Sequence, residues 1–187
     1  MEVSSLFTSA REKAIWIFSL IILLGIFLSL IIGRPLLDLF SNQNVQAEWF
    51  LLGMLIIGAC MILYGITSRP DFIDVVLVLG IVAVYLLLFL RLGLPERSHL
   101  IEYSALSLTI HQALFERGKQ GSKIRFVGLW AIGITSLIGL FDETIQIFIP
   151  DRVFDLNDIL FNCLSAIMAV TVSSFVLYMR KKIIKKN

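Results

Sequence analysis

The chain has 187 residues, of which 58% are hydrophobic and 16% are charged, and its mean hydropathy is +0.89. These values exclude an ordinary soluble domain, in which about 25% of residues are charged. The net charge of +2 says little, because the distribution of the basic residues matters more than their sum. The apolar residues fall in long blocks rather than in helical stripes, and this pattern is typical of membrane spans.

The sequence predicts an all-α, polytopic transmembrane helix bundle with about six spans. Five apolar runs are long enough to cross a hydrocarbon core of ~30 Å at ~1.5 Å per residue. In chain order they cover residues 14–33, 49–67, 72–92, 124–147 and 156–178. The first run is too long for the apolar part of a signal peptide and has no small-x-small cleavage motif, so we expect it to be a retained span.

Residues 98–115 form the expected fourth span, which is polar and therefore the weakest of the six. His99, Glu102 and several hydroxyl and amide side chains interrupt its apolar character. The segment is either a polar-faced span buried among its neighbours or a helix that lies on the membrane surface.

The organisation that follows has four parts. Residues 1–13 form an N-terminal tail, 14–92 hold three apolar spans, 93–178 hold three further helices, and 179–187 form a basic tail. Cys60 and Cys163 each lie within an apolar run and are interpreted as small buried side chains.

The basic residues predict the orientation of the spans. With six spans and both termini in the cytoplasm, 12 of the 16 Lys and Arg residues lie on the cytoplasmic side. A five-span arrangement with the N-terminus outside gives the same division, but it exports Arg11 and Lys13 ahead of the first span. We therefore prefer six spans. The basic tail directly follows a span, so it is expected to contact anionic lipid rather than nucleic acid.

Ionisable and polar side chains are concentrated between residues 142 and 162, where five acidic residues fall within a stretch of seventeen. An ionisable group at the centre of a membrane helix costs roughly 2.5–3.5 kcal/mol. Such groups are expected only where they pair, bind a ligand or line a wet cavity. In the six-span arrangement, the outer ends of the last three helices converge and form an extracytoplasmic polar pocket. Pro150 ends the fifth helix, and Asp155 or Asn157 can cap the sixth.

The expected pocket holds more carboxylates than cations. Its candidate catalytic residues are His99, Asp142 and Glu143. Its candidate binding residues are Glu102, Tyr103, Gln146, Arg152, Asp155, Asp158 and Asn162. Unpaired carboxylates at low dielectric either keep a proton or hold a cation, so a divalent cation is a candidate cofactor. For Gln146, Asp158 and Asn162, a hydrogen-bond network that fixes the helix register is the alternative.

Three motifs resemble the VanZ-like family of bacterial integral membrane proteins, and the similar region runs from about Arg97 to Ser174. The motifs are His99-x-x-x-Tyr103, Asp142-Glu143-x-x-Gln146-x-x-x-Pro150-x-Arg152 and Asp158-x-x-x-Asn162. The chain departs from the family pattern at Asp151 and Ser165, where glycine is usual. The resemblance implies a protein of the bacterial cell membrane that acts at the cell envelope. The family's namesake is associated with resistance to the glycopeptide teicoplanin.

Two functions remain open at this point. In the first, the pocket binds a lipid headgroup, a cation or a peptidoglycan precursor without reaction. In the second, the protein is a membrane-embedded hydrolase or transferase, with Asp142 or Glu143 as general base and His99 as acid or metal ligand. An ion-coupled transporter fits less well, because the ionisable residues cluster at one end and no inverted repeat is visible.

Overall fold

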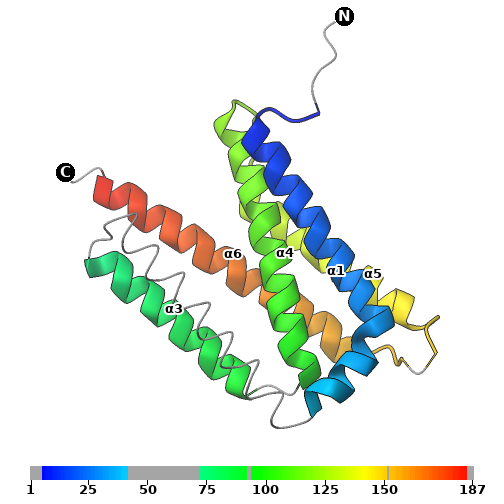
Figure 1. The fold of residues 1–187 in the computed structure, drawn as a ribbon. Helices are drawn as coiled ribbons and strands as arrows, with labels where there is room; N and C mark the ends of the chain where they lie inside the picture. The colour runs from blue at the N-terminus through cyan, green and yellow to red at the C-terminus, as the bar shows by residue number, and fades with distance from the viewer. Residues whose placement is uncertain (1–5, 42–71, 92–93, 151, 185–187) are drawn as a thin grey trace, which may run out of the picture. The chain divides into compact units, whose positions relative to one another are not determined.

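A computed structural model describes residues 6–41, 72–91, 94–150 and 152–184. These residues form five helices and no strand (Figure 1), so the prediction of an all-α fold is confirmed. The helices are α1 (Ala10–Ser41), α3 (Phe72–Arg91), α4 (Leu94–Lys119), α5 (Val127–Gln146) and α6 (Leu156–Ile184). The expected span at 49–67 lies outside the described residues.

The chain divides into two units. The second unit, residues 31–91, contains α3, whose 20 residues coincide with the expected apolar run at 72–92. The first unit consists of residues 1–30 and 92–187 and contains the beginning of α1 together with α4, α5 and α6. All candidate site residues belong to this first unit.

Three helical segments within the described residues are long and apolar enough to cross a membrane. They are Ala10–Leu30, Val127–Gln146 and Leu156–Tyr178. These segments make the chain a membrane protein, but they support only three of the six expected spans. The expected fourth span is a continuous helix within α4, yet its many polar side chains keep it out of this group.

Three polar side chains of α4 face the neighbouring helix α6. Ser104 Oγ donates to the Ser165 carbonyl at 3.4 Å, and Ser107 Oγ donates to the Ala166 carbonyl at 3.3 Å. One to two turns further along, His111 Nδ1 lies 3.1 Å from Ser173 Oγ. Small and hydroxyl residues let two membrane helices approach closely, and their hydrogen bonds join the two backbones. The low hydropathy of α4 therefore reflects its interior position.

Apolar side chains fill the space between the four helices. The buried core cluster comprises Ile26, Tyr103, Leu106, Ile110, Leu114, Ala131 and Val170. Phe27 of α1 contacts Phe141 of α5 edge to face, with ring centroids 6.1 Å apart. The outer faces carry exposed apolar residues such as Leu129 and Leu137, which suits contact with lipid.

Glu12 joins the start of α1 to the end of α4, an interaction that the sequence analysis did not anticipate. Its carboxylate is fully buried and accepts hydrogen bonds from Thr8, Trp16 and Arg117, the last at 2.6 Å. Ser9 Oγ accepts the Glu12 backbone N–H at 3.0 Å, as a helix N-cap does. Ser9-x-x-Glu12 matches the capping-box pattern, which signals the start of α1 but not the contact with Arg117.

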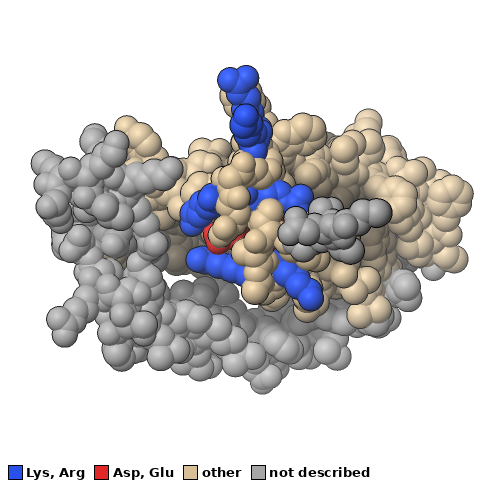
Figure 2. Space-filling view, turned by 90° about the horizontal axis from the view of Figure 1, so that it is seen from above, with Lys and Arg blue, Asp and Glu red and all other residues tan. Residues whose placement is uncertain are grey.

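The same end of the first unit is basic. Figure 2, which looks down on the end where α1 begins and α4 ends, shows Lys and Arg side chains gathered around a small acidic patch. The described residues contribute Arg11, Lys13, Arg117, Lys119, Lys123 and Arg125 to this end. At ~1.5 Å per residue, His99 lies roughly 30 Å from Lys119 along α4. Basic residues and candidate site residues therefore occupy opposite ends of the helix.

Gly139 sets the distance between α5 and its neighbours. A Cβ at this position would lie 2.8 Å from Asn162 Cβ and 3.2 Å from Tyr103 Cε1. Asn162 Cβ is attached to the α6 backbone, so this contact cannot be relieved by a side-chain rotation alone. A hydrogen at residue 139 is therefore required for α5 to approach α6 so closely.

We predict that Gly139→Ala destabilises the protein by about 1–3 kcal/mol, because the added methyl group overpacks the contact with Asn162. The melting temperature of the purified protein in detergent measures this effect. Gly133→Ala on the same helix is the matched control, because nothing lies within 4 Å of its added Cβ. Equal melting temperatures for the two variants would contradict the close packing of α5 on α6.

Candidate functional site

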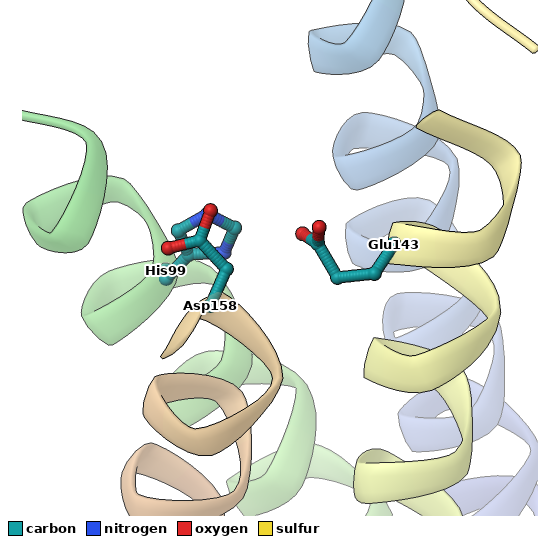
Figure 3. A group of neighbouring side chains, drawn as sticks. All are labelled: His99, Glu143 and Asp158. Atoms are coloured by element: carbon teal, nitrogen blue, oxygen red, sulfur yellow. The ribbon is translucent and has the colours of Figure 1, made fainter. Parts of the chain in front are cut away.

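Three helix ends meet at one group of ionisable side chains. His99 lies in the second turn of α4, Glu143 in the last turn of α5 and Asp158 in the first turn of α6. One ligand-capable atom from each of the three lies within 4.8 Å of the others. Figure 3 shows the imidazole beside the Asp158 carboxylate, with the Glu143 carboxylate pointing toward both from the facing helix. The expected convergence of these helix ends is therefore present.

His99 and Asp158 form the closest pair across two helices. Nε2 lies 3.6 Å from Asp158 Oδ2, and the two side chains are only 12% and 22% exposed. This separation exceeds the usual length of a hydrogen bond. The imidazole also stacks on Tyr103 of the next turn, with ring centroids 6.0 Å apart and an angle of 27° between the planes. Tyr103 thus holds the orientation of the imidazole ring.

Glu143 is fully buried, and both of its carboxylate oxygens are fixed. Gln146 Nε2 donates to Oε1 at 2.6 Å, one helical turn further along α5. The backbone N–H of Asp155 donates to Oε2 at 3.3 Å from the start of α6. These two donors orient the carboxylate, so Gln146 acts on the site through Glu143.

Asp155 has a structural task at the helix terminus. Its Oδ1 accepts the backbone N–H of Asn157 at 2.8 Å, which caps α6 as one of the two expected capping residues. The capping side chain is exposed, and the contact to Glu143 comes from its backbone. The α5 helix ends at Gln146, four residues before Pro150, and turn residues follow.

Several polar atoms next to this group are buried without a hydrogen-bond partner within the described residues. They are His99 Nδ1 and both Nδ2 and Oδ1 of Asn162, whereas the side chains of Tyr103 and Asp142 interact with each other. Asn162 is fully buried and Asp142 is 2% exposed. A buried polar group without a partner costs about 1–3 kcal/mol, so such a group in a native structure calls for an explanation.

Asp142, Glu102 and Arg152 extend the cluster toward α1. Asp142 interacts electrostatically with His99, Arg152 and Asp158, and Glu102 interacts with Asp142 and Arg152. Arg152 Nη2 donates to the Ser29 carbonyl of α1 at 3.3 Å. This hydrogen bond attaches the loop between α5 and α6 to α1. The role of Ser29 could not be predicted from the sequence, because a single serine within an apolar run does not indicate a contact with another segment.

The structure therefore places all ten sequence-predicted site residues at one end of the first unit, although Asp155 and Gln146 act there as supporting residues. Among the side chains that the structure describes, carboxylates outnumber cations in this group, since Glu102, Asp142, Glu143 and Asp158 lie near Arg152 and His99. Such an arrangement suits a cation or an amine more readily than a free anion. Arg152 provides a permanent positive charge beside the carboxylates.

The fold and the site together define a helical membrane protein with an ionisable cluster where three helices end. The sequence pattern of the VanZ/LLP1 family matches residues 5–178, nearly the whole chain. The chain belongs to this family, as its motifs between Arg97 and Ser174 indicated. No protein of curated function and no solved structure matches the chain significantly.

Proposed function

We propose that this VanZ-like protein binds a ligand of the bacterial cell envelope with the cluster at the ends of α4, α5 and α6. The observation that supports the proposal is the convergence of His99, Glu143 and Asp158 from three different helices. Ionisable side chains are costly to bury in a membrane protein, so they are expected either in a functional site or in a hydrogen-bond network that satisfies all of them. The buried atoms without partners argue against a fully satisfied network.

The proposed topology has six spans, with both termini in the cytoplasm and the cluster at the extracytoplasmic surface of the cell membrane. The basic end of the first unit lies opposite the cluster, and an excess of Lys and Arg marks the cytoplasmic side. The exposed apolar faces of the bundle support the contact with membrane lipids.

Cysteine labelling in intact cells tests this topology. After Cys60 and Cys163 are replaced by serine, cysteines at Arg97 and Arg152 should react with an impermeant reagent. A cysteine at Gln120 should react only after the cells are permeabilised, since it lies at the basic end. Labelling of Gln120→Cys from outside would overturn the proposed orientation.

The chemistry of the cluster favours a ligand with both positive and negative groups, such as a lipid headgroup or a peptidoglycan precursor. Arg152 is half-buried and offers a guanidinium that can hold a phosphate or a carboxylate in two hydrogen bonds. The carboxylates of Asp142 and Glu102 provide a counterpart for an amine. Binding of a precursor would connect this protein with the teicoplanin resistance of the family's namesake.

We predict that a peptidoglycan precursor or a phosphatidylethanolamine headgroup raises the melting temperature of the purified protein, and that Asp142→Asn and Arg152→Ala each abolish this increase. Asp142→Asn keeps the size of the side chain and removes a charge from an acid-rich group, so the variant should still fold. Glu116→Gln and Lys123→Ala change similar residues at the opposite end and serve as matched controls. Undiminished stabilisation in Asp142→Asn and Arg152→Ala would contradict binding at this cluster.

A membrane-embedded hydrolase or transferase is the second candidate, and the position of His99 beside Asp158 and Glu143 favours it. A histidine oriented by a carboxylate can move a proton, and a neighbouring acid can act as general base. Turnover of an envelope lipid by purified protein, lost in His99→Ala and Glu143→Gln, would establish it. Binding without turnover across a panel of envelope lipids supports the first proposal instead.

A further inference from the structure

We propose that His99, Glu143 and Asp158 bind a divalent transition-metal ion of the Zn²⁺ class. One imidazole and two carboxylates are provided by three helices, and the site would leave a coordination position open for a ligand. The inference uses the same cluster as the proposed function, but an ion alone, without any envelope ligand, tests it.

The distances between the candidate ligand atoms suit a shared ion. Ligand atoms about 2.0–2.2 Å from one zinc ion lie roughly 3–4 Å from each other. His99 Nε2 and Asp158 Oδ2 are 3.6 Å apart, which is long for a hydrogen bond and appropriate for two ligands of one ion. All three ligand atoms lie within 4.8 Å of one another, so a shift of roughly an ångström within the group would let them share one ion.

The supporting contacts resemble those of a metal site. Carboxylate ligands of metals are held in turn by hydrogen bonds from neighbouring groups. Gln146 Nε2 and the Asp155 backbone N–H each donate to one oxygen of Glu143. Figure 3 shows the carboxylate of Glu143 pointing toward His99 and Asp158.

The buried atoms without partners provide an independent argument. Asp142 is 2% exposed and interacts electrostatically with His99 and Asp158, so it adds negative charge beside the candidate ligands. Asn162 is fully buried one turn beyond Asp158, and neither polar atom of its amide has a hydrogen-bond partner in the described part of the chain. An ion with bound water in this group would supply a hydrogen-bond donor or a positive charge to Asn162 Oδ1.

The donor set favours zinc over calcium or magnesium. Imidazole nitrogen is a common ligand of zinc and other transition metals, whereas calcium and magnesium take oxygen ligands. Three protein ligands with a free position are typical of zinc sites that bind or activate a further ligand. A dication would also offset the two carboxylates and allow a phosphate to approach.

Cobalt is a suitable probe, because Co²⁺ occupies zinc sites and absorbs visible light according to its coordination. The full chain is purified in detergent, treated with a chelator and titrated with Co²⁺. We expect one equivalent of Co²⁺ to give a visible absorption band, which should disappear when added Zn²⁺ replaces the bound Co²⁺. His99→Ala should abolish the band, and Gln146→Ala should weaken binding about tenfold, because it removes a donor that orients Glu143.

His111→Ala is the matched control, since it removes the other histidine of the chain, which contacts Ser173 away from the cluster. Melting curves in the presence of chelator show whether each variant is folded, and His99→Gln repeats the test with a side chain of similar size. No band in the wild-type protein, or an unchanged band in folded His99→Gln, would overturn the metal site. If the Co²⁺ band is absent but an envelope ligand still stabilises the chelated protein, the metal site is wrong and the proposed function stands. If Co²⁺ binds but no envelope ligand stabilises the protein, the metal site stands and the proposed function is wrong.

Discussion

The close approach of α5 to α6 at Gly139 brings the candidate site residues of these two helices together. With only a hydrogen at residue 139, Asn162 and Tyr103 of the facing helices can pack directly against the α5 backbone. One turn beyond this contact, Glu143 faces His99 and Asp158. A larger separation of the helices would move the Glu143 carboxylate away from the other two ligand atoms. Backbone packing and site geometry are therefore parts of a single constraint.

The rest of the first unit supports this constraint from both ends. At the basic end, Glu12 and Arg117 join α1 to α4, while serines and His111 join α4 to α6 along their length. At the acidic end, Arg152 attaches the loop between α5 and α6 to α1. Ser104, Ser107 and His111 of α4 therefore face α6 rather than lipid, and the helix can carry them within an apolar protein.

Much of this arrangement could be predicted from the sequence, because it depends on apolar runs, on the helical spacing of polar residues and on capping residues at helix ends. Long apolar runs predicted the helices at Ala10–Leu30, α5 and α6. The four-residue spacing within the pairs Asp142–Gln146 and Asp158–Asn162 predicted that each pair lies on one helix face. Asp155 before an apolar run predicted the cap of α6. The family resemblance between Arg97 and Ser174 came from the same residues and is confirmed.

Interactions between distant segments could not be predicted in this way. Nothing in the spacing of Glu12 or Ser29 indicates that they contact Arg117 and Arg152, which lie more than a hundred residues away in the chain. The number of spans was inferred from hydropathy together with the distribution of Lys and Arg, and α4 shows where hydropathy is insufficient. A helix that lies inside a bundle can be polar, so its hydropathy does not report whether it crosses the membrane.

The central claim is that the ends of α4 and α6 bring His99 and Asp158 together, and cross-linking in native membranes tests it most directly. In a chain with Cys60 and Cys163 replaced by serine, a short bifunctional thiol reagent is applied to the pair His99→Cys and Asp158→Cys. Ser104→Cys with Ser165→Cys is the positive control for packing of α4 on α6, and His99→Cys with Lys119→Cys is the negative control. The account predicts efficient cross-linking of the first two pairs and none of the third. Cross-linking of the 104–165 pair without the 99–158 pair would contradict it.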